Sequence, residues 1–128
     1  FYLGAAGVQM GTAFLVAKEC NVHQNYKEKV LKAKDIDTMT TGKRLGHPVR
    51  VLKNPFSRAY AKLEYDSSVA DGQLEQFGTG SLRRAAVEGD VQKGSFMCGQ
   101  IAGMIHDIKP CAEVIQEMMG QAETLLNR

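Results

Sequence analysis

A glycine-rich stretch near the beginning of the chain places the strongest constraint on its fold. Residues 3–14 contain three glycines, and residues 8–11 alternate between apolar and polar or small, which is the period of a β-strand. At Gly11 the missing side chain lets another group approach the backbone, beside the hydroxyl of Thr12. Backbone N–H groups in such a bend can bind a phosphate. The stretch predicts a short buried strand and a glycine turn. Glycine turns at strand ends are common, and without other evidence such a turn more often binds no ligand.

The composition predicts one globular, cytoplasmic domain. Of the 128 residues, 44% are hydrophobic and 23% are charged, enough to bury a core and too apolar for a disordered chain. The formal charge of +2 is too small to indicate nucleic-acid or membrane binding, and no apolar run reaches the length of about 18 residues that a membrane span needs. The irregularly spaced Cys20, Cys98 and Cys111 fit a reducing compartment.

A short amphipathic helix is expected over residues 26–34, with Asn21 or Asn25 as its cap. We interpret its lysines as a solvated face, because acidic residues interrupt the charge, and keep an anionic partner as the alternative. These lysines are Lys27, Lys29, Lys32 and Lys34. Nearby, Cys20 and His23 have the spacing of two metal ligands, but no second pair follows, so we predict no metal site.

Alternating β-branched residues predict two strands, over 36–41 and 48–53, that pair as a hairpin. His47 lies in the loop between them and is interpreted as structural or exposed, not as a catalytic base. Asn54 and Pro55 then predict the beginning of a helix, with Asn as cap and Pro in the first turn.

Polar residues with three glycines fill positions 66–80, which we expect to form a mobile connection or a lid. Ser81 is expected to cap a helix over 82–88 that ends at Gly89.

Small residues recur every four positions in the segment 94–105, which predicts a helix with a strip that lacks side chains: Ser95, Gly99 and Gly103. The strip suits packing against a second helix or against a flat ligand. Met97 and Met104 are expected in the core. Residues 107–128 form the last predicted helix, with Pro110 in its first turn and one apolar stripe that must be buried, on a barrel wall or in a dimer interface.

The run Gly7-Val8-Gln9-Met10-Gly11-Thr12 resembles the last barrel strand of the flavin-dependent nitronate monooxygenase superfamily. Within it, the likeness is to the FabK-type enoyl-acyl-carrier-protein reductases and covers nearly the whole chain. The matching segments are Asn25-Tyr26-Lys27-Glu28-Lys29, Asp35-Ile36-Asp37-Thr38, Gly46-His47, Val49-Arg50, Lys53-Asn54, Gly89-Asp90-Val91 and Gly99-Gln100-Ile101-Ala102-Gly103. One departure is Ala13, where members of the family commonly carry an arginine.

The resemblance implies an α/β fold: the C-terminal part of a TIM-type (β/α)8 barrel. Residues 1–20 would be the last barrel strand with its FMN-phosphate turn, and residues 21–128 a mostly helical extension with a hairpin. Such barrels need roughly 250 residues, so the chain is expected to be a fragment whose remaining N-terminal barrel residues include the catalytic ones. The cofactor-binding residues implied are Gln9, Met10, Gly11 and Thr12, with Gly99 and Gln100 as weaker candidates and no catalytic residue in this chain.

The function implied is an FMN-dependent enoyl-acyl-carrier-protein reductase of bacterial fatty-acid synthesis. Hydride from NADH or NADPH would pass through the flavin to an acyl-carrier-protein thioester, in a protein expected to be a homodimer. The lysines near residue 30 are a candidate contact for an acidic carrier protein. Two alternatives stay open: a nitronate monooxygenase, which shares the phosphate anchor, and, from another class, a non-catalytic helical module that binds a partner.

Overall fold

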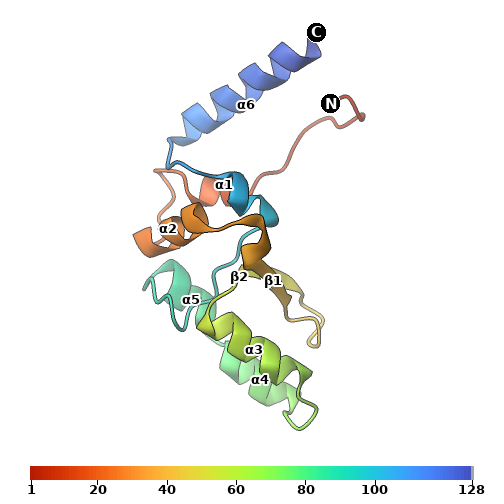
Figure 1. The fold of residues 1–128 in the computed structure, drawn as a ribbon, viewed down its shortest axis with the longest axis vertical. Helices are drawn as coiled ribbons and strands as arrows, with labels where there is room; N and C mark the ends of the chain where they lie inside the picture. The colour runs from red at the N-terminus through yellow and green to blue at the C-terminus, as the bar shows by residue number, and fades with distance from the viewer. Residues whose placement is uncertain (128) are drawn as a thin grey trace.

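A β-hairpin lies near the middle of the structure and separates two groups of helices (Figure 1). The structure is a computed structural model, and it describes residues 1–127. Its elements in chain order are α1 (Thr12–Leu15), α2 (Gln24–Lys32), η1 (Asp35–Asp37), β1 (Thr38–Thr41), β2 (Val49–Leu52), α3 (Pro55–Tyr65), α4 (Asp71–Gly78), α5 (Ser81–Ala86), η2 (Gln100–Met104) and α6 (Cys111–Leu126). Here η marks a short 3-10 helix. None of the helices in this described part is both long and apolar enough to span a bilayer.

The predicted hairpin is confirmed. β1 and β2 pair antiparallel, with Thr38 opposite Leu52. The free edge of β2 is extended by residues 96–98, since the Leu52 amide donates to the Phe96 carbonyl at 2.8 Å. The turn requires glycine at Gly42, where φ is +81° and a Cβ atom would lie 2.3 Å from the His47 carbonyl oxygen.

The larger of two apolar clusters lies between α2, β2 and the segment 96–102. Tyr26 packs on Phe96 with ring centroids 4.8 Å apart, and its hydroxyl donates to the Met97 carbonyl at 2.7 Å. The buried members of this cluster are Val16, Tyr26, Val30, Leu52, Ala85, Phe96, Cys98 and Ala102. The predicted helix α2 thus forms, but His23, not Asn21 or Asn25, caps it by accepting a hydrogen bond from the Asn25 amide.

One lysine of α2 does not lie on a solvated face as expected. Lys27 is buried, and its ammonium donates to the Ala17 carbonyl at 2.6 Å. Burying an ammonium group requires such partners, because an unpaired buried charge is costly. Lys27 therefore fastens α2 to the end of the α1 segment, and the expectation of a solvated lysine face is wrong for this residue.

The second cluster joins α3 and α4. Asn54 and Ser57 exchange side-chain to backbone hydrogen bonds at the start of α3, so the predicted cap is confirmed. The polar segment 66–80 is not a connection without secondary structure, because α4 occupies most of it. Leu74 is fully buried, and the Phe77 ring stacks on Phe56 at 5.3 Å. Burial of these two apolar side chains against α3 stabilises the position of this short helix.

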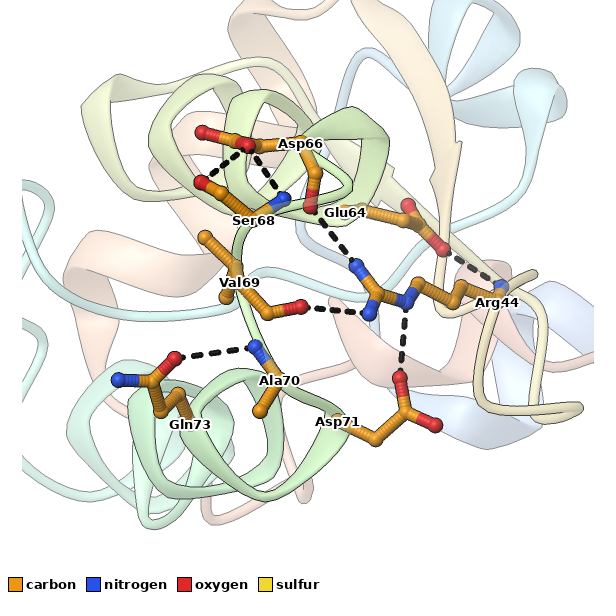
Figure 2. Close-up of polar contacts among 8 residues, drawn as sticks. All are labelled: Arg44, Glu64, Asp66, Ser68, Val69, Ala70, Asp71 and Gln73. Atoms are coloured by element: carbon orange, nitrogen blue, oxygen red, sulfur yellow. Dashed lines mark hydrogen bonds and ion pairs between the residues drawn. The ribbon is translucent and has the colours of Figure 1, made fainter.

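Arg44, in the hairpin loop, connects that loop to the segment between α3 and α4 (Figure 2). Its guanidinium donates to Asp71 Oδ1 at 2.8 Å and to the carbonyls of Asp66 and Val69 at 3.1 and 2.6 Å. Its backbone amide donates to Glu64 Oε1 at 2.9 Å. The planar fork of arginine can satisfy several acceptors at once, so one side chain orders the whole α3–α4 loop.

The expected helix over 94–105 is wrong except for the short 3-10 helix η2. Its glycines instead permit contact with other parts of the backbone. A Cβ atom at Gly94 would lie 2.6 Å from the Asp90 carbonyl oxygen, and one at Gly103 would lie 2.7 Å from the Asp35 amide nitrogen. Met97 is half-buried, whereas Met104 is 79% exposed and not a core residue as expected.

The two ends of the described chain extend together away from these clusters (Figure 1). Residues 1–9 are exposed and form no strand, since no other strand in the described part of the chain pairs with them. The helix α6 begins after Pro110, which precedes it instead of lying in its first turn. Tyr2 donates to the Leu125 carbonyl at 2.7 Å, and the Lys18 amide donates to the Lys109 carbonyl at 3.0 Å.

Candidate functional site

The predicted glycine turn lies where the exposed N-terminal segment meets the folded part of the chain. Gln9 and Gly11 are exposed, and Met10 and Thr12 are half-buried. Gly11 is the residue before α1, and its carbonyl accepts hydrogen bonds from the amides of Phe14 and Leu15. The turn therefore forms at the predicted residues, but it leads into a helical turn and not out of a paired strand.

The backbone N–H groups of this turn have no acceptor among residues 1–127. The amides of Gly11, Thr12 and Ala13 donate to no carbonyl or side chain there, as expected for the first turn of a helix. A Cβ atom at Gly11 would meet nothing within 4 Å, so a ligand can reach the backbone. Three free N–H groups beside an open glycine are suited to the oxygens of a phosphate.

The Thr12 hydroxyl faces the protein instead of the open side of the turn. Its Oγ1 accepts a hydrogen bond from the Gly99 amide at 2.9 Å, across 87 positions of sequence. The structure thus brings the predicted phosphate turn, through Thr12, into contact with Gly99, which was one of the two weaker candidates. Gln100 diverges from them: it is exposed and lines a separate hollow with Lys34, Asp35, Ile101, Gly103 and Met104.

Beside the turn lies an open hollow of about 560 Å³. Apolar side chains line most of it, and Arg50 is its one charged member. Its lining is Gly11, Thr12, Leu15, Tyr26, Val49, Arg50, Leu82, Met97, Cys98 and Gly99. A ligand with a flat or apolar body and an anionic group would match such a lining.

Arg50 and Tyr26 are site residues that sequence reasoning missed. The Arg50 guanidinium donates to Thr38 Oγ1 at 3.1 Å and lies near the Cys98 thiol. Burial raises the pKa of this thiol to about 11, and the positive charge of Arg50 partly opposes that increase. The only sequence signal for Arg50 is its place as the charged residue in an apolar strand.

The other predicted positions lie apart from this hollow. His47 is exposed, and its amide closes the hairpin turn on the Gly42 carbonyl. His23 caps α2, and no group of three His, Cys, Asp or Glu residues suited to a metal ion occurs in the described part of the chain.

Comparison with known proteins places this geometry in a wider context. A family model described as nitronate monooxygenase matches residues 1–121. A probable nitronate monooxygenase of Staphylococcus saprophyticus is 35% identical over 127 residues, which are 98% of this chain and 35% of the relative. The structure of FabK from Thermotoga maritima matches with a TM-score of 0.91 and 46% identity, over 98% of this chain and 40% of that one. A mutant of the same FabK matches with a TM-score of 0.79 and 42% identity. The chain therefore spans about a third of the length of this curated relative.

Proposed function

Since the chain belongs to the nitronate monooxygenase family of oxidoreductases, we propose that it is the C-terminal part of an FMN-dependent enoyl-acyl-carrier-protein reductase. The observation that carries the proposal is the likeness to FabK from Thermotoga maritima, at 46% identity over 98% of the chain. The rest of the protein would complete a TIM-type barrel and supply the catalytic residues.

This chain's part is to hold the phosphate of the cofactor. The amides of Gly11, Thr12 and Ala13 would donate to the phosphate oxygens, and Gln9 and Met10 would line the approach. The Thr12 hydroxyl, bonded to the Gly99 amide, would fix the turn against the apolar hollow. When bound, FMN supplies hydride transfer from NADH or NADPH to the enoyl double bond, while the protein orients the flavin.

A nitronate monooxygenase is the second candidate. It is favoured by the name of the Staphylococcus saprophyticus relative, which is 35% identical, and it would use the same phosphate anchor. The higher identity to FabK favours the reductase. The third interpretation is a non-catalytic helical module. The match to an enzyme family over residues 1–121 argues against it.

We also propose that the exposed N-terminal segment and α6 pack on the rest of the barrel. No residue of α6 is buried, although its apolar side chains follow one stripe. A helix with such a stripe is stable only when another surface covers it. The barrel wall and a second copy in a homodimer are the two surfaces that we consider.

Flavin binding by the full-length protein tests the anchor. Gly11→Asp introduces a negative charge among the free amides, and we expect it to weaken FMN binding at least about tenfold by charge repulsion. Gly72→Asp adds the same charge at another glycine with nothing within 4 Å of a Cβ atom, in α4. It should leave FMN affinity unchanged; equal affinities of the two variants would argue against the anchor.

Substrate assays separate the two enzymes. The reductase proposal predicts bleaching of the flavin by NADH or NADPH and turnover of a crotonyl thioester. Oxygen-dependent oxidation of a nitronate without thioester turnover would instead support the monooxygenase.

A further inference from the structure

A third hollow, of about 300 Å³, is lined by positively charged residues from separate parts of the chain. Lys29 and Lys32 come from α2, and Lys53 follows β2. Ala33, Asp37 and Leu52 complete the lining. Asp37, the one carboxylate in the lining, accepts a hydrogen bond from the Lys34 amide. Among residues 1–127, none of the three lysines forms an ion pair with a carboxylate.

Lys29 is partly buried in this hollow, close to an aromatic ring and to a second positive charge. Its ammonium lies 5.5 Å from the centroid of the Phe96 ring. Its pKa is lowered, first by burial and then by the nearby charge of Arg58. Like charges without a counter-ion destabilise one another, so an arriving anionic group would gain binding energy here.

The ring of Phe96 connects this lysine hollow to the candidate site. Lys29 lies over it, and Tyr26, one helical turn earlier, packs on it and lines the candidate site. The lysine hollow and the apolar hollow are therefore linked through contacts with the same buried ring. Lys32 and Lys53 are exposed, and the three ammonium groups are spread over two segments. The Lys53 ammonium also donates to the Ile36 carbonyl at 2.7 Å, which holds its charge at the surface. Charges carried by separate segments suit several carboxylates of a protein surface better than a single phosphate.

We propose that Lys29, Lys32 and Lys53 form the docking surface for an acidic carrier protein that presents its thioester to the candidate site. This docking proposal rests on the proposed reductase function.

Kinetics of the full-length enzyme on two forms of one substrate test the docking surface. The crotonyl group is attached either to the carrier protein or to N-acetylcysteamine, a small neutral thiol. The triple variant Lys29→Gln, Lys32→Gln and Lys53→Gln should lower kcat/KM for the carrier-bound substrate about tenfold, through KM. It should leave turnover of the small thioester unchanged, which also shows that the variant is folded. Added salt should weaken the carrier reaction of the unsubstituted enzyme and affect the variant less.

A matched triple variant, Lys43→Gln, Lys62→Gln and Lys93→Gln, removes the same charge from exposed lysines outside the hollow. It should behave as the unsubstituted enzyme does. The docking proposal is overturned if both triple variants lose the same activity, or if neither loses any. It is also overturned if inorganic phosphate inhibits both substrates through the three lysines, because the hollow would then bind free anions. Failure of the unsubstituted enzyme to reduce either thioester would instead overturn the reductase function, and the docking surface with it.

Discussion

Burial and charge act in opposite directions on the thiol of Cys98. Burial dominates and raises its pKa from 9.0 to about 11, despite the nearby Arg50. The folded chain therefore keeps a proton that the unfolded chain releases between these pH values. Stability from this group is fully present below about pH 9 and is lost as the pH rises toward 11.

We predict that the urea midpoint of the full-length protein falls between pH 9 and 11, and that Cys98→Ala makes this fall shallower. The fall should not vanish, because burial also raises the pKa of Tyr26, with the same sign of effect. Urea unfolding at a series of pH values measures it. Cys20→Ala, at a half-buried thiol, is the control and should follow the parent protein; an identical slope for Cys98→Ala would contradict the prediction.

At the scale of elements, Arg44 orders the loop between α3 and α4 (Figure 2). Arg44→Ala should lower the free energy of unfolding by about 1–2 kcal/mol, because two carbonyls and a carboxylate lose their donor. Amide hydrogen exchange should also become faster in α4. Arg83→Ala removes only an exposed ion pair of 3.8 Å and should change stability by less than about 0.5 kcal/mol. Slow exchange in α4 of the Arg44 variant would count against this role.

Two glycines should respond oppositely to alanine. Gly103→Ala places a methyl group 2.7 Å from the Asp35 amide and should cost about 1–3 kcal/mol, since backbone atoms cannot yield easily. Gly120→Ala, within α6, meets nothing within 4 Å and should stabilise the helix by about 0.5–1 kcal/mol. Thermal or urea unfolding distinguishes them. An unchanged free energy of unfolding for Gly103→Ala would mean that η1 and η2 can move apart without destabilising the protein.

Short sequence patterns correctly predicted those elements that have a capping residue at their start or a regular alternation of apolar residues. Asn54 and Pro55 define the start of α3, and the alternation around Val51 defines the hairpin. The helix α4 was missed because its packing depends on Leu74 and Phe77 meeting α3, which polar composition conceals. The four-residue spacing of Gly99 and Gly103 suggested a helix face, whereas the contact at Gly103 is with the distant Asp35 backbone.

In the candidate site too, local features could be predicted from the sequence, whereas contacts between distant residues could not. The turn at Gly11 could be located from its sequence, because glycine and threonine together indicate an open backbone. The hydrogen bond from Gly99 to Thr12 could not, since it joins residues 87 positions apart. Arg50 and Tyr26 enter the hollow only through tertiary packing.

At the scale of the whole molecule, α6 presents apolar side chains to solvent in this chain, including Ile115 and Met119, which are 46% and 43% exposed. If the rest of the barrel covers them, Ile115→Asp should destabilise the full-length protein by at least about 2 kcal/mol. Gln116→Asp, at the next position, is the control and should have little effect. Urea unfolding measures both. Equal stability of the two variants would mean that this face of α6 stays in water.

The backbone hydrogen bond between Lys18 and Lys109 brings together the two ends of the segment that lies between them in the sequence. Next to it, the Cys111 amide donates to Glu19 Oε2 at 3.0 Å. The chain thus enters and leaves the segment 20–108 at neighbouring points. If such a segment is exchanged between related enzymes, its contacts with the flanking residues must be matched. These contacts include the Thr12–Gly99 and Lys27–Ala17 hydrogen bonds and the packing of Val16 in the larger apolar cluster. Such chimaeras would show whether the proposed carrier recognition is transferred with this segment.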